Sequence, residues 1–222
     1  MVDFPAPGMP VRQTINFFIE QIARWLLYEG TGNYYKDTSN KIVMRAFVAV
    51  EILNKEVIKA IANLQSEISI RAKAVEPENL HFTLQFLGEI SDDSLTKIRK
   101  SLQTIEFSSF EISFRGVGAF PNMKHPRVVW IGVDDKGGNE LKNLANKVEN
   151  VLSPLGFVSD KPFKSHITVF RIKNKIGDIS KKLERFGNYE FGEGLISGIK
   201  LKQSVLTPQG PVYSDLEEIR AR

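Results

Sequence analysis

The chain has 222 residues, of which 42% are hydrophobic, so it can form one large domain or two small lobes around a buried core. It contains no cysteine, which excludes disulfides, thiolate nucleophiles and zinc–thiolate sites and is compatible with a reducing cytoplasm. Thirty Lys and Arg against 26 Asp and Glu give a net charge of +4, a mild basicity that suits an anionic ligand such as RNA.

Residues 1–43 read differently from the rest of the chain. Apolar residues at helical spacing predict one amphipathic helix at 14–30, followed by a polar linker at 30–40. Polar and charged side chains interrupt the apolar stretch of this helix, which excludes a membrane span and a signal peptide, so we expect a soluble, cytoplasmic protein. Two interpretations remain open: the natural chain starts at Met44, or the extension is an extra helix that packs on the domain or on a partner.

From Met44 onward, helices and strands alternate. The predicted elements are a strand at 45–52, a helix at 54–71, a strand at 80–88, a helix at 92–104 capped by Ser91, strands at 111–114 and 127–133, a helix at 138–152, a strand at 165–172, a helix at 176–186, and strands at 194–206 and 211–216 joined by a turn at 207–210. The order helix, strand, helix, strands occurs twice. The sequence therefore predicts an α+β domain at 44–222, a bilobal duplicated fold with two antiparallel sheets facing across a central groove and helices outside.

Two of the three histidines open the same pattern of His, apolar, Thr, apolar: His81-Phe-Thr-Leu and His166-Ile-Thr-Val. Both patterns lie on predicted strands, where side chains at i and i+2 project from one face. Each motif therefore sets an imidazole beside a hydroxyl, Thr83 in the first and Thr168 in the second, while its apolar residues point into the core.

Convergence of the two motifs would gather two imidazoles and two hydroxyls in one site. A neutral and a protonated imidazole can act as general base and general acid for an in-line displacement at phosphorus. Threonine hydroxyls are suitable donors to the non-bridging phosphate oxygens. Neither motif carries a nearby carboxylate, thiolate or further histidine at ligand spacing, so no metal site is predicted.

The segments 79–88 and 164–173, which contain these motifs, resemble the two signature strands of the two-histidine (2H) phosphoesterases. The match is best to the LigT-like branch, RNA 2',3'-cyclic phosphodiesterases once named 2'-5' RNA ligases. Collinear blocks at 44–51, 126–130 and 204–213 extend the resemblance from Met44 to about Ile219. Ser165 departs from the family, which often has proline before the second histidine.

The resemblance implies a bilobal fold that uses neither a metal nor an organic cofactor. It implies hydrolysis of a terminal RNA 2',3'-cyclic phosphate to a 2'-phosphomonoester. In that reaction His81 would be the proton donor to the ribose O3' leaving group, and His166 the proton acceptor that activates water. Thr83 and Thr168 would bind the phosphate.

Four further residues are candidates for substrate binding, each with a structural alternative. Arg171 lies five residues after His166, so strict alternation puts it on the opposite face unless a bulge or strand end turns it back toward phosphate. Arg127 precedes a buried-looking strand, and His125 lies in a loop. Phe86 would stack on a terminal base or pack in the core.

The expected partner is RNA with a 2',3'-cyclic phosphate end, tRNA fragments among them, and the protein is expected to be a monomer. Three alternatives fit the same residues. They are 2'-5' ligation of tRNA halves with cyclic phosphate and 5'-hydroxyl ends, a non-catalytic RNA-binding module, and a phosphodiesterase of small nucleotides.

Overall fold

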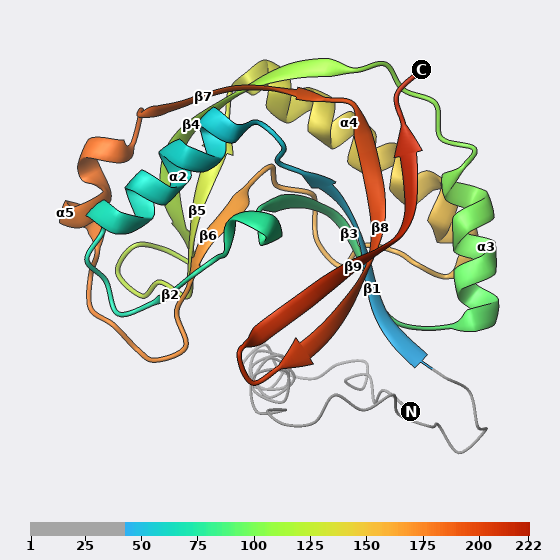
Figure 1. Ribbon diagram of the computed structural model, residues 1–222, viewed down its shortest axis with the longest axis horizontal. Coiled ribbons are helices and arrows are strands. Elements are labelled where there is room, and N and C mark those ends of the chain that lie inside the picture. Colours follow the sequence, from blue (N-terminus) through green and yellow to red (C-terminus); the bar gives the residue numbers. More distant parts are fainter. Residues whose placement is uncertain (1–42) are drawn as a thin grey trace, which may run out of the picture. The chain divides into compact units, whose positions relative to one another are not determined.

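The computed structural model describes residues 43–222 (Figure 1). The helix and linker expected at residues 14–40 lie outside the described residues. Residues 43–204 and 213–222 belong to one compact unit, and residues 205–212, at the tip of the last hairpin, belong to another. Within that tip the Thr207 hydroxyl donates to the carbonyl of Gly210 at 2.7 Å. None of the described helices is both long and apolar enough to cross a membrane.

The strands of the described chain form one hydrogen-bonded sheet. In chain order they are β1 (Val43–Glu51), β2 (Lys73–Ala74), β3 (His81–Ser91), β4 (Phe110–Phe120), β5 (Val128–Val133), β6 (Ile167–Arg171), β7 (Glu190–Ile196), β8 (Gly198–Thr207) and β9 (Gly210–Arg220). Their order in the sheet is β7-β4-β5-β6-β3-β1-β8-β9, and β2 pairs with β6. The pairs from β7 to β8 are antiparallel, which confirms the expected α+β class and strand orientation.

The two sheets expected from the sequence are the two halves of this order. One half is β7-β4-β5-β6 and the other is β3-β1-β8-β9, each with one histidine motif at its inner strand. A single residue pair, Phe82 opposite Ile167, joins β3 to β6. Because so few hydrogen bonds link the halves, each can keep its own twist while the motifs stay adjacent.

The helices are α2 (Lys55–Glu67), α3 (Asp92–Leu102), α4 (Asp135–Leu152) and α5 (Ser180–Leu183), with 3-10 turns at Pro77–Asn79, Ser153–Leu155 and Glu184–Phe186. Short polar side chains start the first two helices. The Asn54 carboxamide oxygen accepts from the backbone N–H of Glu56 at 2.8 Å, and the Ser91 hydroxyl accepts from that of Ser94 at 3.3 Å, as expected for Ser91.

One helix, α4, runs from one half of the sheet to the other, whereas α2 stays on one half (Figure 1). Helix α2 follows β1 in the chain but packs on β6 and β7, and α4 packs on both β3 and β4. The buried face of α2 is Val57, Ile61 and Leu64. On the sheet side, the apolar motif residues are buried as predicted: Phe82, Leu84, Ile167 and Val169. The motif histidines and threonines therefore lie on the face turned away from this core.

The observed start of α4 corrects the predicted start at Gly138 by three residues. Gly137 and Gly138 are poor helix formers, so their low helix propensity made the predicted helix begin one turn too late. The Asp134 carboxylate caps this turn by accepting from the backbone N–H of Gly137 at 3.1 Å. A Cβ at Gly137 would lie 2.6 Å from both Asp134 and Ile112, so close packing requires glycine here.

The C-terminal strands differ more from expectation. The single strand predicted at 194–206 is two strands, divided at Ser197: β7 pairs with β4 at one edge, and β8 pairs with β1 in the other half. A continuous apolar pattern cannot reveal that the chain changes partner within it. The helix predicted at 176–186 is also shorter, and consists of α5 and the 3-10 turn that follows it.

Removal of the Phe82 side chain should cost much of the protein's stability. Phe82 is fully buried and stacks on Phe114 with ring centroids 6.0 Å apart. We expect Phe82→Ala to lower the free energy of unfolding by about 3–5 kcal/mol, measured by urea denaturation. Phe86→Ala in the same strand, where the residue is 70% exposed, should change it by less than about 0.5 kcal/mol. A loss below about 1 kcal/mol for Phe82→Ala would contradict its role at the junction.

Candidate active site

The register between β3 and β6 brings the two motifs together. Phe82 lies opposite Ile167 in an antiparallel pair. One residue to either side, the same register sets His81 opposite Thr168 and Thr83 opposite His166. Directly opposed side chains on one face have Cβ atoms about 4.5–5.5 Å apart. The two histidines and two threonines therefore form a pseudo-twofold cluster around the Phe82–Ile167 pair.

Each motif strand has a β-bulge immediately after its threonine. In β3, Thr83 opposes Ala49 and Gln85 opposes Val48, so Leu84 is the extra residue. In β6, Thr168 opposes Trp130 and Phe170 opposes Val129, so Val169 is the extra residue. An extra residue shifts the alternation of faces by one.

The two bulges return the fifth residue after each histidine to the face of the motif. These residues are Phe86 in β3 and Arg171 in β6, and both are exposed while the residues between the threonine and them are buried. Arg171 thus avoids the opposite face that strict alternation gives it. The duplicated frame presents an aromatic ring on one side and a guanidinium on the other.

Both imidazoles are held in the same way by the backbone. The Nδ1 of His81 lies 2.7 Å from the carbonyl oxygen of Asn79, and the Nδ1 of His166 lies 2.7 Å from that of Lys164. A carbonyl only accepts, so each Nδ1 carries the proton and each neutral Nε2 keeps its lone pair. The Nε2 of His81 is 3.1 Å from the Thr83 hydroxyl oxygen.

Aromatic rings support each imidazole from the side. His81 lies beside Phe47, with ring centroids 5.1 Å apart, and meets Tyr213 edge-on at 5.5 Å. His166 meets Phe120 edge-on at 5.0 Å. The rings restrict the imidazoles and remove water from them, which favours the neutral form.

Burial and positive charge both lower the pKa values of the two histidines. Burial is the largest cause at His81, and Arg171 and Lys202 add to it, so the pKa falls to about 4 despite the hydrogen bond to Asn79. Burial also lowers the pKa of His166, and Arg171 and Lys164 act in the same direction. Arg171 acts on both imidazoles, which places its guanidinium within electrostatic reach of each.

Arg171 also donates a hydrogen bond to the Tyr213 hydroxyl, whose pKa is raised mainly by burial. The guanidinium is thereby tied to the β9 side of the site, close to His81. Arginine offers several donors in one plane, which matches the oxygens of a phosphate group. Arg171 is the one arginine predicted from the sequence that the structure brings to the motif cluster.

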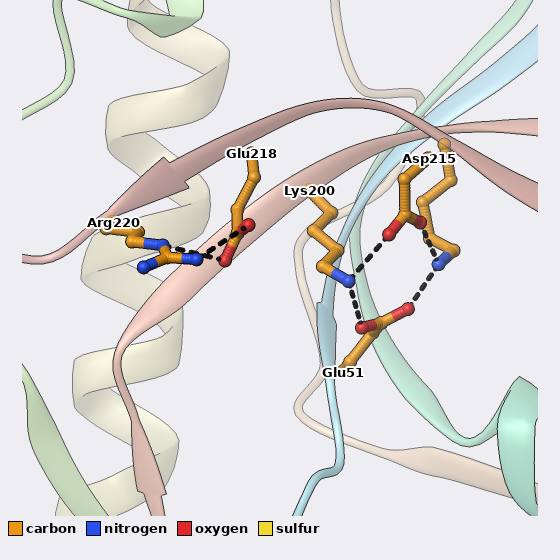
Figure 2. Close-up of polar contacts among 6 residues, drawn as sticks. Glu51, Lys200, Asp215, Glu218 and Arg220 are labelled. Atoms are coloured by element: carbon orange, nitrogen blue, oxygen red, sulfur yellow. Dashed lines mark hydrogen bonds and ion pairs between the residues drawn. The ribbon is translucent and has the colours of Figure 1, made fainter.

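A partly buried quartet of charged side chains joins β1, β8 and β9 (Figure 2). Lys202 forms ion pairs with Glu51 and Asp215, and Lys200 pairs with the same two carboxylates at 2.6 Å each. The Lys202 side chain is only 6% exposed, and Glu51 is the cross-strand neighbour of His81. Two positive and two negative charges balance one another, which offsets the cost of burying the Lys202 side chain.

The sequence did not point to Lys202, Phe47, Tyr213 or Trp130 as parts of the site. The sheet register explains their presence: Phe47 opposes Phe86 on one side and Lys202 on the other, and Trp130 opposes Thr168. The sequence carried only a weak indication of these residues. Phe47, Trp130 and Tyr213 lie in blocks that resemble the family, but nothing in those blocks assigned them a place.

His125 and Arg127 lie apart from the motif cluster. Together with Lys175 they line a small cavity of about 230 Å³ in the loop before β5. The Arg127 guanidinium donates to the carbonyl oxygen of Lys173 at 2.9 Å, so it ties this loop to the end of β6. A substrate contact by Arg127 stays a prediction.

A larger cavity of about 420 Å³ opens beside the second motif. His166, Lys164 and Ser165 line it at one side, and residues of β4, β5 and the start of α4 complete it.

Among the residues that the structure describes, no three His, Asp or Glu side chains are grouped so that they could hold a metal ion. The site thus offers two imidazoles with unprotonated Nε2 atoms, two hydroxyls and one guanidinium.

Comparison with known proteins gives one family. The family described as LigT like Phosphoesterase matches the chain twice in succession, at residues 50–130 and 131–213, and each match contains one histidine motif. The chain is 49% identical over 175 residues to an RNA 2',3'-cyclic phosphodiesterase of Archaeoglobus fulgidus, covering 78% of this chain and 98% of that protein. It is 41% identical over 167 residues to another so named from Aeropyrum pernix, covering 72% and 94%.

Solved structures agree with this result. A crystal structure of a Thermus thermophilus protein superposes with a TM-score of 0.66 at 34% identity, covering 80% of this chain and 97% of that one. Escherichia coli LigT shares the fold, with a TM-score of 0.65 at 23% identity over 81% of this chain and 98% of its own. With its two collinear family matches and its paired motifs around the Phe82–Ile167 junction, the chain belongs to the LigT-like branch of the 2H phosphoesterases.

Proposed function

We propose that this protein hydrolyses the 2',3'-cyclic phosphate at an RNA end to a 2'-phosphomonoester, without a metal ion. The observation that carries the proposal is the paired arrangement of His81 with Thr168 and His166 with Thr83 around one strand junction. The relatives named RNA 2',3'-cyclic phosphodiesterases, matched over nearly their whole length, support the same reaction. The basic charge of the chain suits an RNA substrate.

In the proposed reaction the two imidazoles move the two protons. The neutral Nε2 of His166 takes a proton from water, the hydroxide oxygen bonds to phosphorus, and the bond from phosphorus to O3' breaks. The Nε2 of His81 gives its proton to the leaving O3'. The backbone hydrogen bonds at Nδ1 leave only Nε2 available on each ring, so both transfers occur through the same type of atom.

Negative charge that develops on the phosphate oxygens is met by fixed donors. The hydroxyls of Thr83 and Thr168 lie on the motif face, and Arg171 supplies a full positive charge. Such preorganised donors stabilise the transition state without rearrangement. Phe86 is exposed next to the first motif and offers a surface on which the terminal base can stack.

Product analysis tests the reaction directly. Incubation with an oligonucleotide that ends in a 2',3'-cyclic phosphate should add the mass of one water and give a 2'-phosphate end, with the same rate in EDTA, since protein groups perform both proton transfers. Mass spectrometry and resistance of the end to a 3'-phosphatase identify the product. Loss of activity in EDTA that zinc or magnesium restores would contradict the metal-independent mechanism.

Removal of either motif histidine should abolish most turnover without unfolding the protein. We expect His81→Ala and His166→Ala each to lower kcat by about 100- to 10,000-fold, because each removes one proton-transfer group. His125→Ala is the matched control, since His125 is exposed and lies in the separate loop cavity. Near-wild-type turnover in either motif variant, with circular dichroism unchanged, would overturn the paired scheme.

Anion binding should be coupled to proton uptake by His81. Free His81 has a pKa near 4 and is neutral at pH 6. A bound anion offsets the positive charge of Arg171 and favours the protonated imidazole, so the pKa of His81 is higher in the complex than in the free protein. The affinity for the anion should therefore fall as the pH increases through this raised pKa. This proton uptake should be measured by calorimetry of sulfate binding at pH 6, as a binding enthalpy that changes with the ionisation enthalpy of the buffer.

Variants identify the residue that takes up the proton. His81→Gln should abolish the uptake, and His166→Gln should retain it, because His81 is assigned as the acid. If only His166→Gln abolishes the uptake, the roles of the two histidines are reversed.

A further inference from the structure

Cross-strand rows of side chains continue the motif face of the first half beyond the histidine site. Strand β1 alternates without a bulge against β8, so Arg45 lies on the same face as Phe47, which supports the first motif histidine. In β3, Phe86 opposes Phe47, and Glu89 opposes Arg45. Thr83 opposes residue 49 of β1, so its row lies about 13 Å along the strand from that of Arg45. Arg45 and Glu89 therefore form the outer row of the same face.

Phe86 is the aromatic surface between the threonine row and the outer row. Its side chain is 70% exposed, whereas Phe47 is buried and supports it, with ring centroids 6.2 Å apart. Unpaired RNA bases stack on aromatic side chains of this kind. A terminal nucleotide with its phosphate at the threonines and its base on Phe86 would turn the far edge of that base toward Arg45 and Glu89.

The two charged side chains of the outer row form a weak ion pair. The guanidinium of Arg45 lies 3.4 Å from the carboxylate of Glu89, beyond the about 2.7–2.9 Å of a strong charge-assisted hydrogen bond. Both side chains are partly exposed, and exposed ion pairs contribute little to stability. A ligand can therefore engage both groups without the loss of a strong interaction. The row offers a donor next to an acceptor at the end of the stacking surface.

The order of donors and acceptors distinguishes guanine from adenine. The Watson–Crick edge of guanine has the acceptor O6 beside the donors N1–H and N2–H, whereas adenine has the donor N6–H beside the acceptor N1. We propose that Arg45 and Glu89 select guanine as the terminal base, Arg45 by donating to O6 and Glu89 by accepting from N1–H and N2–H. Adenine would set its amino group against the guanidinium and its N1 lone pair against the carboxylate. The inference rests on the proposed function and on its placement of the base on Phe86.

The same order of groups ranks the two pyrimidines. Uracil has the acceptor O4 beside the donor N3–H, so it matches the pair with one hydrogen bond fewer than guanine. Cytosine has an amino donor beside an acceptor nitrogen, as adenine does. The expected order of preference is guanine, then uracil, then adenine and cytosine.

Turnover of two purine nucleotides tests the selection. Guanosine and adenosine 2',3'-cyclic phosphates have bases of equal size, so they should stack alike on Phe86. We expect kcat/KM to be at least about tenfold higher for guanosine. The difference should lie in KM, because the edge of the base is remote from the reacting atoms. Inosine 2',3'-cyclic phosphate, which lacks the N2 amino group, should fall between the two.

Variants assign the preference to the outer row. Arg45→Ala and Glu89→Ala should each lower the ratio of kcat/KM for guanosine to that for adenosine by about tenfold, because each removes one charged partner. Arg185→Ala is the matched control. It removes an exposed arginine that pairs with Glu67 at 2.6 Å between the turn after α5 and helix α2. A wild-type ratio near one, or an unchanged ratio in Arg45→Ala, would overturn the proposal.

Binding of the product separates base selection from chemistry. Calorimetric titration of the whole chain with guanosine 2'-monophosphate should give a Kd about tenfold lower than with adenosine 2'-monophosphate. Arg45→Ala should remove this difference, with its circular dichroism unchanged. Absence of hydrolysis by the wild-type protein would refute the proposed function, while equal Kd values for the two products would refute the selection of guanine.

Discussion

The pairing of Phe82 with Ile167 is the contact on which the candidate site depends. Both side chains are fully buried, and their register alone sets each motif histidine opposite the threonine of the other motif. A shift of one residue would turn every motif side chain to the opposite face. Helix α2 packs on β6, and α4 packs on β3 and on β4, so helices hold both motif strands against the core.

The electrostatics of the site are arranged around an anion. The positive charges of Arg171 and Lys202, opposed by the negative charge of Glu51, disfavour a further positive charge on the His81 imidazole. In the reaction that we propose, the substrate is the counter-charge that lets His81 hold the proton needed by the leaving group. Lys202 is paired with Glu51 and Asp215, and Glu51 is also the cross-strand neighbour of His81.

The duplication supplies a symmetric frame, and the two halves use it differently. Equivalent bulges place Phe86 on one side and Arg171 on the other. The cross-strand neighbour of Thr83 is the small Ala49, whereas that of Thr168 is the large Trp130. Trp130 is also part of the lining of the cavity of about 420 Å³ beside the second motif.

The sequence by itself determined the paired motifs, the strands that carry them, the Ser91 cap and the α+β class, because these follow from local spacing and capping chemistry. Tertiary structure decided the division of the last strands at Ser197, the bulges at Leu84 and Val169, and the placement of Lys202, Tyr213 and Trp130. Alternation along a strand gives the face of each side chain but not the strand that lies beside it. The neighbours of His81 and His166 are set by pairings between distant segments, which only the folded chain specifies.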